Sequence, residues 1–317
     1  MTRVAITGAS GFVGSHTARA VLANGDDVVL IARHPDIMAT PSGGHATWVA
    51  ADIGDERALT RAFTMCDAVI HCAGINLERG VQTYAAVHVQ GTAAVVRAAQ
   101  AAHVPRIALV SFLRARPACG SAYHESKWAA EELVRRSGLT YTILKAGVIC
   151  GEGDHLLSHL SKSLSSLHVF LLVGFGSHRT LRPVAVADVA RILVASTHDT
   201  RLDSVTVPVL GPEELTLAQV VECVGTEVGR APRCIPAPIA LHRALAWAAE
   251  HLMVVPLVSA AQVRILAEGV VEPVLAPDTL PEDLTPATPF SPASIRAALP
   301  ATRGFTRHDL RAFRHPA

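Results

Sequence analysis

The sequence has 317 residues, of which 50% are hydrophobic and 17% charged, and its formal net charge is +1. A chain of this length and composition can bury a core large enough for one α/β domain or two modest ones. The charge is near zero and forms no blocks, which argues against a nucleic-acid-binding surface and against a polybasic membrane patch.

The cysteines and the apolar runs bear on the compartment. No pair of cysteines has CxxC spacing, which argues against a zinc ribbon or a disulfide framework and predicts reduced thiols in the cytoplasm. We expect no signal peptide and no membrane span, because the apolar runs are short or interrupted; peripheral membrane contact stays open. The six cysteines are Cys66, Cys72, Cys119, Cys150, Cys223 and Cys234.

In chain order, short apolar runs alternate with amphipathic segments through the first half. Strand–helix alternation with nearly continuous apolar strands predicts a parallel sheet covered on both faces, with right-handed crossovers. The expected fold class is therefore α/β, a doubly wound parallel sheet of the Rossmann type. The predicted strands are 3–7, 27–32, 46–50, 67–74, 106–111 and 140–147, and the predicted helices are 11–24, 55–64, 84–103 and 122–137.

After about residue 150 the pattern changes. A strand leads into a helix across 182–196, with Asp188 near the helix start, and a Pro- and Thr-rich tail over 272–300 predicts irregular structure. We expect 1–150 to form a dinucleotide-binding core completed by 183–203, and 151–182 with 204–317 to form a smaller substrate region. Other predicted elements are helices at 154–167 and from about 215, a strand at 205–210, and an Ala- and Leu-rich helical pair across 239–268.

The N-terminal segment VAITGASGFVGSHTARAVLANG combines a strand, a glycine turn and a helix. Gly8 permits a tight turn, Gly11 permits close approach of a pyrophosphate, and Gly14 permits the helix to pack against the sheet. The free N–H groups at the helix start then face the phosphates. We expect a dinucleotide here, with Ser10, Phe12 and Val13 also lining it.

The end of the second predicted strand bears on the choice of cofactor. NAD-binding proteins usually place an acidic residue there to hold the ribose 2′-hydroxyl, whereas this chain has Arg33 followed by His34. An arginine can pair with a 2′-phosphate, so NADP(H) is favoured over NAD(H). The alternative is that Arg33 is a solvated surface residue.

A set of motifs in this order resembles the short-chain dehydrogenase/reductases. The likeness covers roughly 1–200 and is to the extended and atypical branch, which includes NAD(P)-dependent epimerases and dehydratases. The later VGFG…RPVAVADVA and the helical tail are similar to relatives of the nucleotide-binding accessory subunit of respiratory complex I. The motifs are TGASGFVG (7–14), ADI (51–53), HCAG (71–74), GT (91–92), YHESK (123–127) and KAGVICGEG (145–153).

The resemblance implies roles by position. Asp52 and Ile53 would lie at the adenine, and Tyr123 would be the acid/base group, with Lys127 holding the nicotinamide ribose and lowering the pKa of Tyr123. The stretch Cys72-Ala73-Gly74 would let the fourth strand approach the adenosine ribose.

The Tyr123–Lys127 pair also has a physical basis apart from the family. Four-residue spacing places both side chains on one face of a helix. A tyrosine has a pKa of about 10 in water, and a nearby ammonium favours the phenolate, which brings the pKa toward neutral pH.

The chain departs from the family at the substrate side of this pair. The family places a Ser or Thr just beyond the fifth strand to hydrogen-bond the substrate carbonyl, but here Phe112 and Leu113 stand there; Ser111 and, less well placed, Ser121 are the alternatives. His88 stands where extended members have an Asn. Lys145-Ala146-Gly147 replaces Arg-Pro-Gly. These changes weaken the stabilisation of a developing oxyanion.

Two functions remain open. The first is an NADP(H)-dependent oxidoreductase of a small carbonyl or alcohol, with Tyr123, Lys127 and Ser111 as catalytic candidates. The second is an NADPH-binding module that contacts a protein or membrane complex. We expect no metal site, since the pair His155 and His159 lacks a third ligand, and we expect a monomer or homodimer.

Overall fold

The computed structural model describes residues 1–35, 41, 44–166, 169–174, 180–253, 263 and 271–300. The chain divides into two compact units. Unit 1 contains 1–147, 186–209 and 273–287, and unit 2 contains 148–185, 210–272 and 288–317. The division differs from the expected one because 204–209 and 273–287, which the sequence placed in the substrate region, belong to unit 1.

Unit 1 is built on a seven-stranded sheet in which every neighbouring pair is parallel. The order β11-β6-β5-β4-β1-β2-β3 reverses between β1 and β4, which confirms the expected doubly wound α/β fold. Ligands of such sheets bind at the carboxyl ends of the strands beside this reversal. The strands are β1 (Arg3–Thr7), β2 (Asp27–Ala32), β3 (Ala46–Ala50), β4 (Ala68–His71), β5 (Arg106–Phe112), β6 (Thr140–Ala146) and β11 (Val205–Val209).

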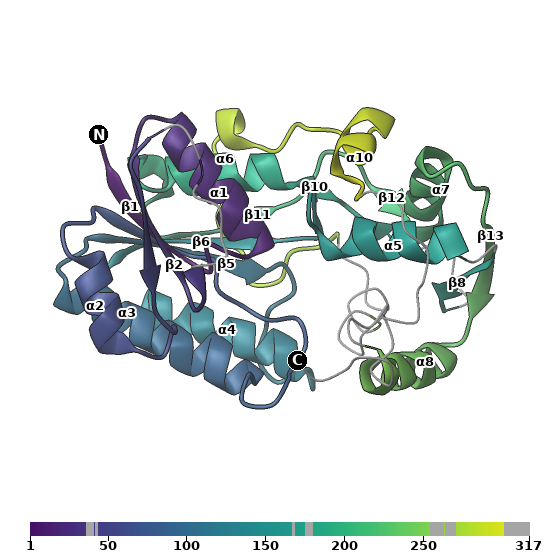
Figure 1. Ribbon diagram of the computed structural model, residues 1–317, viewed down its shortest axis with the longest axis horizontal. Helices are drawn as coiled ribbons and strands as arrows, with labels where there is room; N and C mark the ends of the chain where they lie inside the picture. Colours follow the sequence, from purple (N-terminus) through teal and green to yellow (C-terminus); the bar gives the residue numbers. More distant parts are fainter. Residues whose placement is uncertain are drawn as a thin grey trace. The chain divides into compact units, whose positions relative to one another are not determined.

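Helices cover both faces of this sheet (Figure 1). One face carries α1 (Phe12–Ala23) and α6 (Val186–Ala195), which pack against each other. The other carries α2 (Glu56–Phe63), α3 (Gly91–Ala101) and α4 (Ala122–Arg135). Two of these begin at side-chain caps: the Asp55 carboxylate accepts from Ala58 N, and the Ser121 hydroxyl accepts from His124 N.

The segment predicted as one helix over 84–103 contains a change of helical type. Residues Ala85–Gln90 form a π-helical turn, η2, which runs directly into α3. Such turns re-aim the side chains they hold and are frequent at functional sites. Here the turn contains His88, which is buried.

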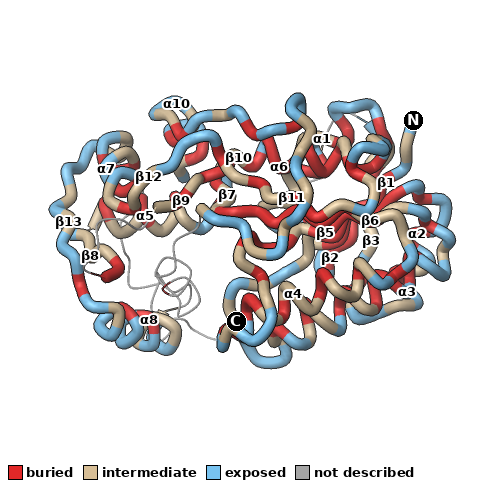
Figure 2. The backbone as a smooth tube through the Cα atoms, turned by 180° about the vertical axis from the view of Figure 1, so that it is seen from behind, coloured by how far each residue is buried: buried red, intermediate tan, exposed pale blue. Residues whose placement is uncertain are grey.

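One large hydrophobic cluster of unit 1 lies between the sheet and α2, α3 and α4. Aliphatic and aromatic side chains from both layers meet there because the strands are apolar on both faces and each helix has one apolar side. Figure 2 shows the central strands buried, with the outer sides of the helices exposed. Fully buried members include Leu59, Phe63, Val69, Val95, Val134 and Ile143.

The segment 273–287 is fastened to unit 1 by hydrogen bonds and an ion pair. The Val274 amide donates to Leu113 O at 3.2 Å, and the Thr206 amide donates to the Asp278 carboxylate at 2.7 Å. Asp283, in the turn η4 (Glu282–Leu284), pairs with Arg201 in the turn η3 (Thr200–Leu202) at 2.8 Å. Residues 273–287 of the predicted irregular tail therefore belong to unit 1.

The described residues of unit 2 form three two-stranded sheets. They pair β7 (Ile149–Cys150) with β10 (Val184–Ala185), β8 (Val169–Val173) with β13 (Arg233–Ala237), and β9 (Thr180–Leu181) with β12 (Leu215–Thr216). Of the helical pair predicted across 239–268, the first is α8, and the second falls almost wholly outside the described residues. Helices of unit 2 are α5 (His155–Ser166), α7 (Leu217–Glu227), α8 (Ile239–Leu252) and α10 (Pro292–Ala298).

No helix in the described part of the chain is both long and apolar enough to cross a membrane.

Candidate cofactor and catalytic site

The glycine turn joins β1 to α1 and has the geometry of a phosphate cradle. Gly8 has a φ of +70°, and the Gly11 amide donates to Gly8 O at 2.9 Å. A Cβ on Gly14 would lie 2.2 Å from Gly8 O, so the first turn of α1 packs directly on the loop. Ser10 and Gly11 are exposed, and Phe12 and Val13 are half-buried at the start of α1. The free amides of this helix start are thus open to a ligand.

The end of β4 lies against this turn. A Cβ on Gly8 would lie 2.7 Å from the backbone of Ala73, and the Cys72 amide donates to Thr7 O at 3.1 Å. A Cβ on Gly74 would lie 3.1 Å from Lys127 Nζ. The glycine turn, the Cys72–Gly74 segment and Lys127 therefore form one continuous surface at the carboxyl ends of β1 and β4.

The residues expected at the adenosine lie at the carboxyl ends of β2 and β3, which are paired through Ala32 and Ala50. Arg33 follows β2 directly and is exposed. The Asp52 carboxylate accepts from the Gly54 amide at 2.8 Å, which fixes the turn after β3. Ile53 packs on the start of α3, where a Cβ on Gly91 would lie 2.5 Å from Ile53 Cδ1.

Tyr123 lies in the first turn of α4, within a cluster of rings. Its centroid is 5.5–5.8 Å from those of Tyr84, His88, Phe112 and His124. Burial, and to a lesser extent Tyr84, raises the pKa of Tyr123 well above its ordinary value, which is opposite to the lowering that the sequence predicted from Lys127.

Lys127 lies one helical turn after Tyr123 on the same face of α4. Its Nζ donates to Val110 O at 3.3 Å. Burial lowers the pKa of Lys127 to about 8, while the charges of Cys72 and Glu131 act in the opposite direction. The ammonium form therefore predominates at neutral pH by a narrow margin.

His88, which the sequence marked only as a departure from the family, faces this pair. Its Nε2 accepts from the Ile75 amide at 3.1 Å, so Nδ1 carries the proton and donates to Ser126 Oγ at 2.9 Å. Ser126 donates in turn to Tyr123 O. Burial, then the charge of Lys127, lowers the pKa of His88 to about 2. The neutral imidazole thus links the loop after β4 to the turn of α4 that holds Tyr123.

The two serine candidates are both engaged within unit 1. The Ser111 hydroxyl donates its one proton to Glu131 Oε1 at 2.5 Å, and both residues are buried. The Ser121 hydroxyl accepts from the His124 amide at 3.5 Å as the cap of α4. Phe112 and Leu113 occupy the usual donor position and are buried. In this arrangement Ser111 can accept a hydrogen bond from a substrate but has no proton left to donate.

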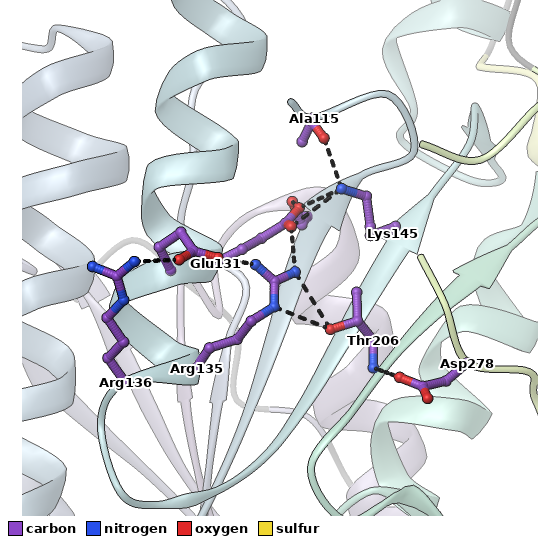
Figure 3. Close-up of polar contacts among 9 residues, drawn as sticks. Ala115, Glu131, Arg135, Arg136, Lys145, Thr206 and Asp278 are labelled. Carbon is purple, nitrogen blue, oxygen red and sulfur yellow. Dashed lines mark hydrogen bonds and ion pairs between the residues drawn. The ribbon is translucent and has the colours of Figure 1, made fainter. Parts of the chain in front are cut away.

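Glu131 belongs to a buried ionic network that motif comparison did not predict (Figure 3). Lys145 pairs with it at 3.0 Å, and Arg135 pairs with it at 2.7 Å. The signal was present in the sequence as a four-residue repeat along one helix face, formed by Tyr123, Lys127, Glu131 and Arg135.

Within the described residues, no cluster of three or more His, Cys, Asp or Glu side chains has the arrangement of a metal site. The rings of His155 and His159 lie 5.9 Å apart on α5.

Comparisons with known proteins point to a nucleotide-binding protein. The profile of the NAD(P)H-binding family matches residues 8–200. The chain is also similar in fold to the NAD-bound UDP-glucuronic acid 4-epimerase of Bacillus cereus. That likeness has a TM-score of 0.65 at 18% identity and covers 74% of this chain and 87% of the epimerase.

Curated relatives include proteins of different kinds. A ceramide reductase of Caulobacter vibrioides is 31% identical over 74% of this chain and 73% of its own length. The 40 kDa subunit of NADH-ubiquinone oxidoreductase of Neurospora crassa is 23% identical over 84% of this chain and 72% of its own.

A further relative is much longer than this chain. An uncharacterized protein of Mycobacterium tuberculosis is 32% identical over 70% of this chain, but the match covers only 23% of that protein's length.

Proposed function

Because this chain belongs to the NAD(P)H-binding family, as its resemblance to the short-chain dehydrogenase/reductases predicted, we propose that it is an NADP(H)-dependent reductase of a carbonyl substrate. The observation that carries the proposal is the single surface formed by the glycine turn, the Cys72–Gly74 segment and Lys127, with Tyr123 one helical turn away. This surface combines a place for a dinucleotide with a proton donor.

The described residues fit a dinucleotide. Gly8, Gly11 and Gly14 present bare backbone at three positions of the turn and helix start, and two of the three have no room for a Cβ. Arg33 stands exposed where a 2′-phosphate would lie, and Asp52 and Ile53 follow the neighbouring strand. Lys127 would hold the ribose next to the nicotinamide. We therefore favour NADP(H) over NAD(H).

Tyr123 can supply the proton that reduction of a carbonyl requires. A phenol held neutral can donate its proton to the oxygen of a carbonyl as that oxygen gains negative charge. The cofactor supplies the hydride. One relative is named a ceramide reductase, and this name also implies reduction. We therefore include lipid ketones among the first substrates to screen.

The test is turnover of NADPH with aldehydes, ketones including lipid ketones, and quinones. Tyr123→Phe should lower kcat by roughly 10²–10⁴ while leaving NADPH binding intact. Tyr84→Phe is a matched control, because Tyr84 packs in the same ring cluster and its hydroxyl donates to Asn76 O. Full activity in Tyr123→Phe would eliminate the tyrosine as the proton donor.

The alternative is an NADPH-binding module with little or no catalysis. The commitment of the Ser111 proton to Glu131 favours it, because the serine next to the usual donor position then has no proton to donate. The relative that is a respiratory-complex subunit points the same way. Tight NADPH binding with no turnover across the substrate screen would favour this function.

For the setting we keep the expectations from the sequence: a small-molecule substrate, a cytoplasmic protein, and a monomer or homodimer. Light scattering of the purified chain with and without NADPH tests the oligomeric state.

A further inference from the structure

Four side chains repeat at four-residue spacing along α4, beginning with Tyr123 and Lys127 and continuing with Glu131 and Arg135. Residues at this spacing lie on one face of a helix, each about one turn beyond the last. The first two belong to the proposed catalytic site. The third, Glu131, is fully buried and so is its partner Lys145, both with side chains 0% exposed.

The Glu131 carboxylate is fully engaged (Figure 3). Oε1 accepts from Ser111 at 2.5 Å and from Lys145 at 3.0 Å. Oε2 accepts from Lys145 at 3.1 Å and from Arg135 at 2.7 Å. Each oxygen of the Glu131 carboxylate therefore accepts from two donors, and the donors include the cationic side chains of Lys145 and Arg135.

Lys145 fixes this carboxylate in place from β6. Its three N–H bonds go to the two oxygens of Glu131 and to Ala115 O at 2.8 Å. Ala115 lies in the connection between β5 and α4, and Lys145 is paired in register with Ser111 of β5. The network thus ties two strands and one loop to the helix that holds Tyr123 and Lys127.

We propose that Glu131 is a positioning residue for the Tyr123–Lys127 pair, and that its carboxylate, anchored by Lys145, is the counter-charge that keeps Lys127 an ammonium beside Gly74. This inference deepens the proposed function and rests on it.

The physical need for a counter-charge comes from the burial of Lys127. A lysine removed from water loses its proton unless a negative charge is near. The groups acting on Lys127 are the Cys72 thiol, the neutral His71 and His88, and Glu131. Burial raises the pKa of the Cys72 thiol to about 12, so at neutral pH this thiol is uncharged. The carboxylate among the groups acting on Lys127 is that of Glu131, which forms an ion pair with Lys145 at 3.0 Å.

Two substitutions change the net charge near Lys127 with opposite sign. Glu131→Gln removes the negative charge and leaves Lys145, so Lys127 should lose its proton at lower pH. Lys145→Met leaves Glu131 less compensated, so Lys127 should keep its proton to higher pH. For Glu131→Gln a shift of up to about 2 pH units is expected for charges one helical turn apart at the effective dielectric of a protein. The shift for Lys145→Met should be smaller, because Lys145 acts from β6.

The experiment follows the dissociation constant of NADPH against pH by quenching of tryptophan fluorescence, and kcat/KM against pH where a substrate is found. Binding should weaken as pH rises through the Lys127 titration, at about pH 8 in the unsubstituted chain. This loss of affinity is the alkaline limb of the pH profile. Lys127→Met should lack the limb, and its absence there would assign the limb to Lys127. The limb should move down in Glu131→Gln and up in Lys145→Met.

Glu132→Gln is the matched control. Glu132 makes its own ion pair with Arg135 at 2.7 Å, is one residue away and is partly exposed, so its loss should leave the limb in place. The double variant Glu131→Gln/Lys145→Met has no unpaired lysine in the network, which guards against a single variant that fails to fold. Its limb should fall between that of Glu131→Gln and that of the unsubstituted chain.

Shifts of the same sign in Glu131→Gln and Lys145→Met, or no shift, would overturn the inference, because a purely structural network changes stability without opposite changes in titration. The binding profile needs no turnover. Failure of the reductase proposal would therefore appear as absent turnover with the shifts intact, and failure of this inference as turnover without them.

Discussion

The Ser111 hydroxyl and the Glu131 carboxylate lie 2.5 Å apart in the interior of unit 1, with the hydroxyl as donor. Ser111 is the residue that a motif comparison would offer as the carbonyl donor of a reductase. Its proton instead completes an ionic network between β5, β6 and α4. The proposed role of Ser111 as a donor and the buried ionic network therefore require the same hydroxyl proton.

Ser111→Ala should behave as a stability variant. It removes a hydrogen bond to a buried carboxylate, which should cost about 2 kcal/mol of unfolding free energy, while turnover should slow only a few-fold. Urea unfolding and NADPH turnover measure the two quantities. Ser121→Ala is the comparison, since loss of the α4 cap should cost about 1 kcal/mol. If Ser111→Ala instead slowed turnover by roughly two orders of magnitude with unchanged stability, Ser111 would be restored as the donor.

Gly14→Ala and Gly11→Ala should separate folding from cofactor binding. A methyl on Gly14 would meet Gly8 O at 2.2 Å, which requires the helix to move and should cost about 3 kcal/mol. A methyl on Gly11 would meet the same oxygen at 3.2 Å, a contact the loop can accommodate. Thermal unfolding should therefore change mainly in the first variant. NADPH affinity should fall in both, and an unchanged affinity in Gly11→Ala would remove the pyrophosphate from this turn.

Arg33→Ala should discriminate between the two cofactors. Loss of a charged hydrogen bond to a 2′-phosphate should weaken NADPH binding by roughly 10- to 100-fold and leave NADH almost unchanged. Isothermal titration with each cofactor measures this. Arg61→Ala, another exposed arginine on unit 1, controls for the general loss of positive charge. Equal effects of Arg33→Ala on both cofactors would contradict the assignment.

His88→Gln should reduce the loss of unfolding free energy that the unsubstituted chain shows as pH falls. The pKa of buried His88 is lowered to about 2, below its ordinary 6.5, so the unfolded chain binds a proton that the folded chain does not. Its contribution is therefore complete above about pH 6.5 and is lost as pH falls. Between about pH 7 and pH 5 the unsubstituted chain should lose about 2 kcal/mol more than the variant.

Urea unfolding at those two pH values measures that difference. His45→Gln, at an exposed histidine, should behave like the unsubstituted chain. A His88→Gln profile parallel to the unsubstituted one would show that His88 is not the group responsible.

The sequence was sufficient for the sheet because its strands are apolar on both faces. The bounds of β1, β2 and β3 match those expected. The turn at Gly8 was also predictable, because glycine adopts a positive φ without strain. Strand β11 was expected, but its place beside β6 was not, since a short apolar run does not say which sheet it joins.

The candidate site was less accessible from sequence for a related reason. Tyr123 and Lys127 follow from local spacing, but the partners of Ser111 and His88 lie 20 and 38 residues away along the chain. The Lys145–Glu131 pair joins a strand to a helix across 14 residues, and no motif specifies it. The sequence alone therefore could not show whether other residues already engage the hydroxyls of Ser111 and Ser121.

The return of 273–287 to unit 1 has a consequence for the chain as it is synthesised. The Leu113 carbonyl and the backbone N–H and C=O of Thr206 receive their partners from Val274 and Asp278, which leave the ribosome only after most of unit 2. Unit 1 therefore cannot complete its own bonding in the order in which it is made. The hydrogen bonds from Val274 and Asp278 can form only after the intervening residues of unit 2 have been translated.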